Sequence, residues 1–272
     1  MVKSRVMDFL YYIIISILVV YALMSAYLYL FQRSILYIPV KEMSAPANYG
    51  LTNMEEVKIK TNDGINLTAW YAKPKEKESV MLYLHGNAGN LGDRTEKISN
   101  YLNAGFGILA LSWRGFGSSE GEPSEQGLYN DARSAIKYLQ NLGYKDKQIF
   151  LYGESLGSGV AVQMATEHDF LALILEAPYT SISNRAAELY PYIPVKLLLK
   201  DHFDSISKIS KVKTPVLIFH GYLDDVMPIS HGRRMLEAAN EPKEVRFFEH
   251  TGHTDFDFEL LSKIMHEFVH KW

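Results

Sequence analysis

Short apolar runs alternate with longer amphipathic segments from residue 80 to the C-terminus. Runs such as residues 172–175 are apolar without interruption, which is typical of strands covered by helices on both faces. Strands are predicted at residues 80–84, 107–112, 148–152, 172–176, 215–219 and 244–248, and helices near 92–103, 125–141, 156–167, 229–239 and 255–270. This alternation predicts an α/β fold with a mostly parallel, doubly wound sheet, whose ligands collect at the carboxyl ends of the strands.

Two segments depart from this alternation. Residues 56–60 and 65–72 alternate around the turn sequence Asn-Asp-Gly at 62–64, which predicts an antiparallel hairpin at the sheet edge. Residues 179–213 are rich in aromatic residues and contain two prolines, so we expect a small lid over the site. The expected organisation is an N-terminal stub and anchor at 1–31, a connector at 32–54 and a catalytic domain at 55–272.

Residues 9–31 form an uncharged apolar stretch that is long enough for a helix to cross a bilayer. A cleaved secretory signal is the competing interpretation, but its apolar core is usually about 7–15 residues long. No small-x-small cleavage site is found near residues 22–26. A buried helix of a soluble domain normally carries a polar stripe, which this stretch lacks. We therefore expect an uncleaved, single-pass membrane anchor.

The cations that flank this stretch give an orientation. Lys3 and Arg5 precede it closely, whereas Arg33 and Lys41 follow it. The positive-inside rule then places the N-terminus in the cytoplasm and the catalytic domain on the non-cytoplasmic side of the membrane.

Composition excludes several classes of protein. The chain has 272 residues, 47% of them hydrophobic, and a net charge of −3, so it is expected to fold and offers no basic surface for nucleic acid. It contains no cysteine, which excludes disulfides, thiolate catalysis and cysteine-ligated zinc.

The sequence Gly-Glu-Ser-Leu-Gly at 153–157 lies between a predicted strand and a predicted helix. A serine in such a turn has its hydroxyl pushed above the sheet, and small residues are needed two positions before and after it. Gly153 and Gly157 occupy those positions, so Ser155 is the candidate nucleophile.

Partners for this serine follow other predicted strands. Asp224 follows the strand at 215–219, and His253 follows the strand at 244–248. In the expected chemistry His253 takes the proton of the Ser155 hydroxyl, and Asp224 holds the imidazole in the correct tautomer. The backbone N–H groups of Leu156 and Asn87 are the expected oxyanion donors.

Two of these assignments have rivals in the sequence. Asp225 adjoins Asp224, and His250 shares a loop with His253. Glu154, beside the candidate nucleophile, is expected to be a packed or hydrogen-bonded side chain rather than an acid catalyst.

The remaining chemistry-bearing residues are expected to be structural. Two histidines end buried strands and three fall on expected solvated helix faces: His85 and His220, and His231, His266 and His270. None pairs with a carboxylate at a metal-ligand spacing, so no metal or cofactor is expected. The glycine-rich residues 114–121 match no phosphate-binding pattern and are expected to form a structured loop near the site mouth.

Three motifs together resemble those of membrane-anchored α/β-hydrolase-domain serine hydrolases of the bud-emergence type. They are His-Gly-Asn-Ala-Gly-Asn at 85–90, Trp-Arg-Gly-Phe-Gly-Ser-Ser-Glu-Gly at 113–121 and Gly-Glu-Ser-Leu-Gly at 153–157. The likeness spans roughly residues 55–270 and includes the N-terminal anchor. It implies an α/β-hydrolase fold with Ser155, Asp224 and His253 as the triad, Asp224 standing in a His-Gly-x-x-Asp-x-x-x-Pro pattern.

The function expected from these features is hydrolysis of a carboxylic ester or thioester through an acyl-enzyme. The substrate would be a small-molecule or lipid-like acyl ester whose chain the apolar lid buries near the membrane. A peptidase or amidase with the same triad and a non-catalytic membrane scaffold are the alternatives, since a fold does not name its substrate. The sequence leaves the oligomeric state open.

Overall fold

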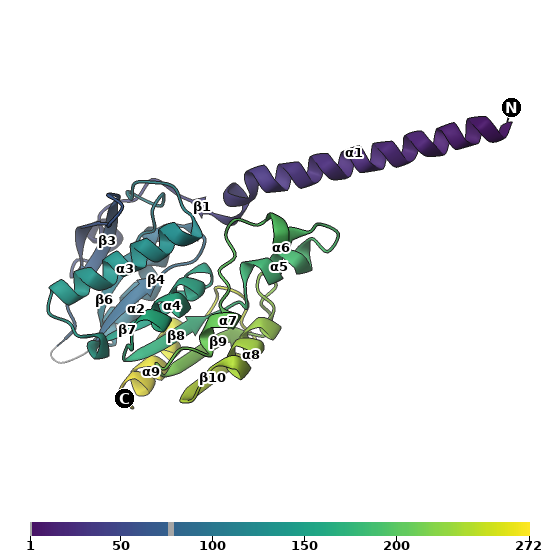
Figure 1. The fold of residues 1–272 in the computed structure, drawn as a ribbon. Coiled ribbons are helices and arrows are strands. Elements are labelled where there is room, and N and C mark those ends of the chain that lie inside the picture. Colours follow the sequence, from purple (N-terminus) through teal and green to yellow (C-terminus); the bar gives the residue numbers. More distant parts are fainter. Residues whose placement is uncertain (1, 76–78) are drawn as a thin grey trace.

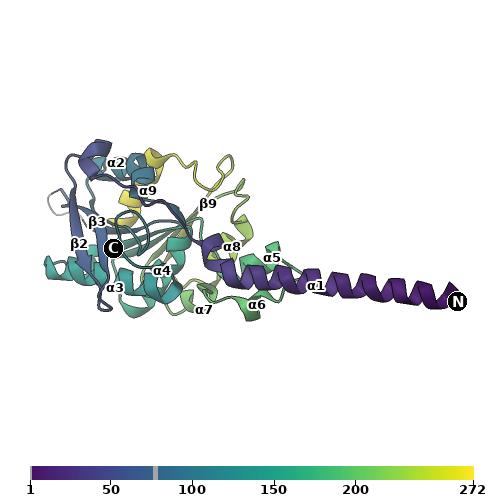
Figure 2. The same cartoon turned by 90° about the horizontal axis from the view of Figure 1, so that it is seen from above.

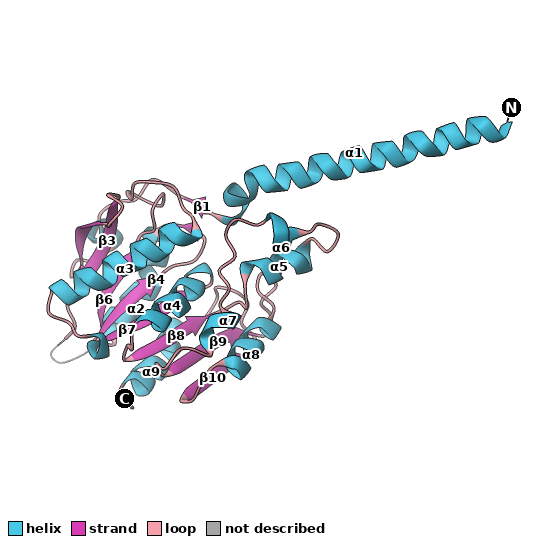
Figure 3. Cartoon of the chain, viewed as in Figure 1, coloured by secondary structure: helices cyan, strands magenta, loops and turns pink. Residues whose placement is uncertain are grey.

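The chain is organised around a central eight-stranded sheet. The computed structural model describes residues 2–75 and 79–272; Met1, the first residue of the expected anchor segment, and the side chain of Lys3 lie outside the described part. The strand order is β10-β9-β8-β7-β4-β6-β3-β2 (Figures 1 and 3). The strands are β2 (Glu55–Lys60), β3 (Asn66–Ala72), β4 (Val80–Leu84), β6 (Gly107–Leu111), β7 (Ile149–Glu154), β8 (Ala172–Glu176), β9 (Val216–Gly221) and β10 (Lys243–Phe248).

Strand direction follows the predicted pattern. Six neighbouring strands run parallel, namely β10, β9, β8, β7, β4 and β6. Strands β2 and β3 form an antiparallel hairpin at one edge, and β3 is antiparallel to β6. The hairpin turn is closed by the Thr61 hydroxyl, which accepts from the N–H of Ile65, and by Gly64 at φ +88°. The predicted fold class, including the edge hairpin, is therefore confirmed.

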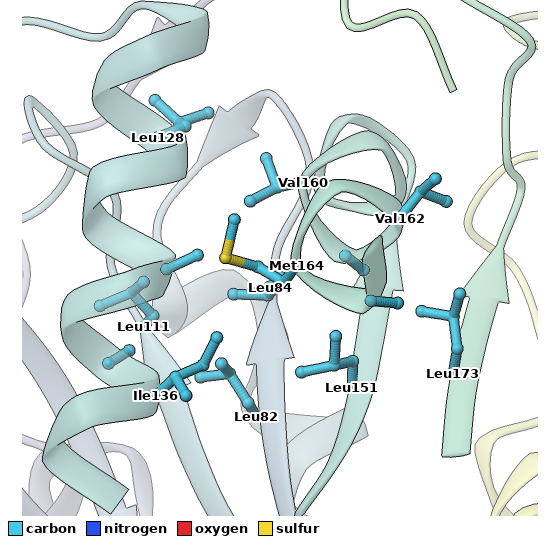
Figure 4. Close-up of a cluster of buried hydrophobic side chains, with 14 of the residues drawn as sticks. Leu82, Leu84, Leu111, Leu128, Ile136, Leu151, Val160, Val162, Met164 and Leu173 are labelled. Carbon is cyan, nitrogen blue, oxygen red and sulfur yellow. The ribbon is translucent and has the colours of Figure 1, made fainter. Parts of the chain in front are cut away.

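Helices cover both faces of the sheet, because its strands are apolar on both sides. Strand β4 is buried at all five positions. The helices are α2 (Thr95–Asn103), α3 (Glu125–Asn141), α4 (Leu156–Glu167), α8 (Ile229–Ala238) and α9 (Phe258–Val269). One core cluster joins the sheet to α3, α4 and α8, as Figure 4 shows around Leu82, Leu151 and Val160, and a second joins it to α2 and α9.

Helix α1 (Val2–Leu36) projects from this body as one continuous rod (Figures 1 and 2). It runs past the uncharged stretch, so the first five residues of the expected connector are helical. Beyond it, β1 (Ile38–Pro39) pairs in parallel with β5 (Ala88–Gly89), and the short helix η1 (Pro46–Tyr49) follows. The connector thus binds directly to the loop after β4.

The segment after β8 contains three short helices. Helices α5 (Ile182–Leu189) and α6 (Val195–Leu198) lie beside the base of α1 in both views (Figures 1 and 2). Helix α7 (Ile206–Ile209) packs near α4 and α8. Of the lid expected at 179–213, residues 202–213 do not line the cavity above Ser155, so the term lid is restricted to residues 182–201.

Candidate active site

Ser155 occupies the sharp turn between β7 and α4. Its backbone has φ 48° and ψ −114°, a region that L-residues rarely adopt and that functional sites retain at a cost. The turn is held by a hydrogen bond of 2.9 Å from the Ser155 N–H to the carbonyl of Glu176 at the end of β8. Neighbouring parallel strands therefore position the hydroxyl at their carboxyl ends.

The two flanking glycines are required by close backbone approach. A Cβ on Gly153 would lie 2.6 Å from the Cα of Ser158, and one on Gly157 would lie 2.0 Å from the carbonyl oxygen of Leu84. Both neighbouring atoms belong to the backbone, so a side chain could not be accommodated by a rotamer change. The sequence argument for small residues at these positions is confirmed.

The structure brings Ser155, His253 and Asp224 into one hydrogen-bonded row. The Nδ1 atom of His253 lies 2.8 Å from Oδ2 of Asp224, and its Nε2 atom lies 3.0 Å from Oγ of Ser155. An ionised carboxylate only accepts hydrogen bonds, so Nδ1 carries the proton and Nε2 is left to accept from the serine hydroxyl. In this tautomer His253 can act as a base toward Ser155.

Charge within the row favours the same arrangement. Burial raises the pKa of Asp224, but hydrogen bonds from His220, His253 and the Met227 N–H outweigh it and hold that pKa well below its usual range. Burial lowers the pKa of His253, and the hydrogen bond and charge of Asp224 reverse this effect, so it lies above its usual value. Asp224 thus stays ionised and stabilises the imidazolium that a base must form.

Both rivals lie away from this row. Asp225 and His250 are exposed, whereas Asp224 is buried within the loop between β9 and α8. The backbone carbonyl of Asp225 accepts a hydrogen bond from Arg185. The geometry therefore favours Asp224 and His253 over their neighbours.

The expected oxyanion donors border the same cavity as Ser155. Leu156 begins α4, where the first N–H groups have no acceptor inside the helix. Asn87 lies in the loop after β4, which the connector holds through bonds from the Ile38 N–H to the Asn87 carbonyl and from the Asn87 side chain to the Leu36 carbonyl. The two expected donors thus come from separate segments, the start of α4 and the loop after β4, that border one cavity with Ser155.

Beneath the turn lies a buried ion cluster that sequence reasoning did not identify. The Lys97 ammonium lies 2.8 Å from Glu154 and 2.8 Å from Glu176, and Arg94 lies 3.1 Å from Glu154. Tyr83 donates to Glu154 and Tyr152 donates to Glu176. The expectation that Glu154 is a hydrogen-bonded structural side chain is confirmed.

Burial sets the protonation of this cluster together with charge. Burial opposes ionisation of Lys97, but the charges of Glu154 and Glu176 outweigh it and raise its pKa. Burial raises the pKa of Glu176 despite the nearby Lys97 charge. The pKa of Glu154 lies well below its usual range because Lys97 and Arg94 more than offset its burial.

A cavity of about 250 Å³ opens above Ser155. Its floor includes Ser155 and Leu156, and its walls come from α5, α6 and the last turns of α1. Most lining side chains are apolar, including Leu28, Ile35 and Leu36 of α1. Such a cavity can bury an apolar group next to the serine hydroxyl.

The histidines outside the row have different outcomes. His85 is buried as expected, and its burial lowers its pKa to about 3, so it is neutral. His231 is fully buried, so its expected place on a solvated helix face is wrong: that face of α8 packs on the loop after β8, where Nδ1 meets Thr180 and Nε2 meets Glu188.

His220 has a role that was not anticipated. Its Nε2 atom donates to the Met227 carbonyl at 2.8 Å and lies 3.3 Å from Oδ2 of Asp224. His220 therefore supports the carboxylate that orients His253. The sequence signal for this role was the position of His220 near the end of β9, four residues before Asp224. Among residues 2–75 and 79–272, no group of three or more His, Asp or Glu side chains is placed to hold a metal ion.

Residues 113–121 form the expected structured loop, but none of them is among the described residues that line the cavity. Trp113 donates to the carbonyl of His85 at 3.0 Å, and Phe116 packs edge-on against the His85 ring. Arg114 pairs with Asp131 and Asp63. Aromatic and ionic contacts therefore hold this loop against the C-terminal end of β4 and against α3.

Sequence comparisons find relatives over most of the chain. The family model described as Serine aminopeptidase, S33 matches residues 75–207. A protein of Mycobacterium tuberculosis is 37% identical over 227 residues, covering 82% of this chain and 81% of its own. The alpha/beta hydrolase domain-containing protein WAV2 of Arabidopsis thaliana is 31% identical over 238 residues, covering 79% and 77%. The human alpha/beta hydrolase domain-containing protein 17B is 35% identical over 183 residues, covering 65% and 61%.

Solved structures share the fold at lower sequence identity. An esterase of Pyrococcus furiosus superposes with a TM-score of 0.71 at 18% identity, covering 87% of this chain and 98% of that one. An acetyl xylan esterase of Paenibacillus sp. R4 superposes with a TM-score of 0.64 at 20% identity, covering 87% and 97%.

Proposed function

Since the chain belongs to the family of α/β-hydrolase domain proteins, we propose that it is a membrane-anchored serine hydrolase that cleaves ester or thioester bonds. The observation that carries the proposal is the hydrogen-bonded row from Ser155 through His253 to Asp224, with the serine hydroxyl open to an apolar cavity.

The proposed reaction has two half-steps. Ser155 attacks the acyl carbonyl while His253 takes its proton, and the oxyanion is held by the N–H groups of Leu156 and Asn87. His253 then passes this proton to the departing alcohol or thiol, leaving an acyl group on Ser155. Water, deprotonated by His253, releases the acid and regenerates the serine. Asp224 stays ionised throughout and stabilises the imidazolium.

An acyl substrate is supported by the lining of the cavity, which is mainly apolar. The proposed organisation keeps residues 1–31 as anchor segment, 32–54 as connector and 55–272 as catalytic domain with its lid. The candidate span of α1 from Met7 to Leu36 covers 30 residues, and its uncharged part at 9–31 is long enough to cross a bilayer. Retention of α1 is supported because the Tyr21 hydroxyl donates to the carbonyl of Tyr192 in the lid, a contact that cleavage near residues 22–26 would remove.

The proposed orientation places the N-terminus in the cytoplasm, on the basis of Lys3 and Arg5. Digestion of sealed vesicles with a protease tests it. Degradation of the catalytic domain only after the membrane is opened to the non-cytoplasmic side supports the orientation, and degradation from the cytoplasmic side refutes it.

A fluorophosphonate probe tests the proposed nucleophile directly. The full chain in a membrane should be labelled, and Ser155→Ala should abolish labelling. Ser207→Ala is the matched control, because Ser207 is an exposed serine remote from the cavity. No labelling of the folded wild type, or equal labelling of Ser155→Ala, would refute the proposal and favour a non-catalytic scaffold.

A peptidase is the second candidate, because the matching family model carries the description of a serine aminopeptidase. Matched substrates with one acyl group and an ester, thioester or amide leaving group separate the two. Faster turnover of the amide than of the ester would favour the peptidase.

A further inference from the structure

The candidate span of α1, from Met7 to Leu36, is longer than a bilayer requires, and its C-terminal end carries the polar Gln32 and Arg33. Thirty residues at about 1.5 Å each span about 45 Å, whereas a hydrocarbon core is about 30 Å thick and needs about 20 residues. About ten residues are therefore left over. If the N-terminal two thirds cross the bilayer, the surplus is residues 27–36, which includes the cavity-lining Leu28, Ile35 and Leu36. In this placement, these three side chains of the last turns border the cavity rather than the hydrocarbon.

The lid carries an exposed apolar tip beside α1. Tyr192 and Leu197 are 87% and 86% exposed, which makes them the most exposed large hydrophobic side chains that the structure describes. Leu189 and Tyr190, on the same short segment, are exposed as well. Single exposed apolar side chains are ordinary, but several of them within one short segment, here from the end of α5 to α6, mark an interaction surface.

Polar contacts fasten this tip along α1. The Tyr21 hydroxyl donates to the carbonyl of Tyr192 at 2.9 Å. Gln32 donates to the Leu198 carbonyl and accepts from the Lys200 N–H at 2.7 Å. These contacts fix the position of the lid along the axis of α1, and Figure 2 shows α5 and α6 on either side of that helix.

A second fastening is ionic. The Arg33 guanidinium lies 2.8 Å from the buried carboxylate of Asp201, which also accepts from the N–H of Glu125 at the start of α3. The base of the lid is therefore tied to both α1 and the body, while its tip points along α1 away from the body (Figure 1).

The position of the lid tip along α1 sets its depth in the membrane. Tyr21 lies six residues before Tyr27, so the lid tip reaches about 9 Å below the point where α1 would leave the hydrocarbon. Amphipathic elements that lie in the interface bury their apolar side by about 5–10 Å. Tyrosines and lysines such as Tyr192 and Lys196 are also the side chains found at that level, the lysines extending their charges toward the headgroups.

We propose that the lid tip is embedded in the headgroup boundary of the bilayer that holds α1, and that the cavity receives the substrate's acyl chain from that bilayer. The lid tip contacts lipid, and the last turns of α1 form one wall of the acyl site. The identity of the substrate rests on the proposed hydrolase activity, and the position of the tip rests only on the proposed membrane span of α1.

The depth of the tip can be measured without any activity, because the chain contains no cysteine and a single introduced one is unique. Leu197→Cys carries an environment-sensitive nitrobenzoxadiazole label, in the full chain reconstituted at one copy per phosphatidylcholine nanodisc. Leu142→Cys is the matched control, since Leu142 is also an exposed leucine but follows α3 on the body.

We expect brominated lipid to quench the label at 197 at least about threefold more than the label at 142, and aqueous iodide to show the reverse order. Equal iodide quenching at both positions would overturn the proposal. Protection of position 197 from iodide without quenching by brominated lipid would also overturn it, because protein rather than lipid would then cover the tip.

A second measurement tests delivery of the acyl chain. In Leu197→Glu the ratio of turnover of a long-chain ester in the nanodisc to that of a soluble short-chain ester should fall about tenfold or more, because a charge replaces an apolar membrane contact. Leu142→Glu should leave this ratio unchanged. An unchanged ratio in Leu197→Glu would overturn delivery from the bilayer. Absence of fluorophosphonate labelling in every variant would refute the proposed function and leave the depth result standing.

Discussion

Within the buried ion cluster, loss of the Lys97 charge should lower the stability of the fold most. Its ammonium is the cation that faces both Glu154 and Glu176, at 2.8 Å each, while Arg94 contacts Glu154. The four charges sum to zero. In Lys97→Met, Glu176 keeps its burial and loses its counter-ion, so one carboxylate beneath the nucleophile turn is left uncompensated.

Breaking a buried pair by removing one partner costs about 3–5 kcal/mol. For a domain of this size each kcal/mol corresponds to about 2–4 °C, so the melting temperature should fall by about 6–20 °C. Thermal unfolding of the full chain, followed by intrinsic tyrosine and tryptophan fluorescence in one detergent, gives this shift. Lys263→Met is the control, because Lys263 makes an exposed pair with Glu259 on α9 and should leave the melting temperature unchanged.

The pH dependence has a definite sign. Without Lys97 the pKa of Glu176 in the folded state rises further above its value in the unfolded chain, so the folded state takes up a proton more readily. The deficit of Lys97→Met should therefore shrink as pH falls from 8 to 5. Adding Glu176→Gln should restore much of the stability, since Arg94 and Glu154 remain as a balanced pair. A melting temperature equal to that of the wild type, or a double variant that loses more than Lys97→Met, would refute this reasoning.

Three further predictions concern catalysis. Because Asp224 raises the pKa of His253 above 6.5, hydrolysis should be lost on acidification at a pH above that value. In Asp224→Asn the acidic limb of the pH–rate profile should move to lower pH, and kcat should fall about 10⁴-fold. An unshifted pH–rate profile would contradict the assignment of Asp224. Gly157→Ala should abolish probe labelling, because its Cβ would lie 2.0 Å from the Leu84 carbonyl; labelling at the wild-type rate would contradict the close approach. His220→Ala should lower kcat about 10- to 100-fold with little change in KM, and His220→Gln should recover part of it; a change in KM alone would argue against positioning of Asp224.

The elements of the catalytic body could be predicted from the sequence because each depends on local pattern. Continuous apolar runs indicated the central strands, and the hairpin followed from alternation around Asn-Asp-Gly at 62–64. The turn at Ser155 could be predicted for the same reason. Backbone atoms of adjoining elements approach Gly153 and Gly157 so closely that any chain with this turn needs glycine or a similarly small residue there. The order of Ser155, Asp224 and His253, each just after a strand, placed them at one edge of the sheet.

Only the tertiary structure decided which distant side chains meet. Lys97 contacts carboxylates 57 and 79 residues away, and nothing in the periodicity of its helix signals them. The exposure expected for His231 was wrong because a helix pattern cannot say which loop will cover it. The contact of α1 with the cavity likewise joins residues more than 150 positions apart, as the Gln32–Leu198 bond shows. Local pattern determines an element and its apolar face, whereas charge pairing and cavity walls arise only when separate elements pack together.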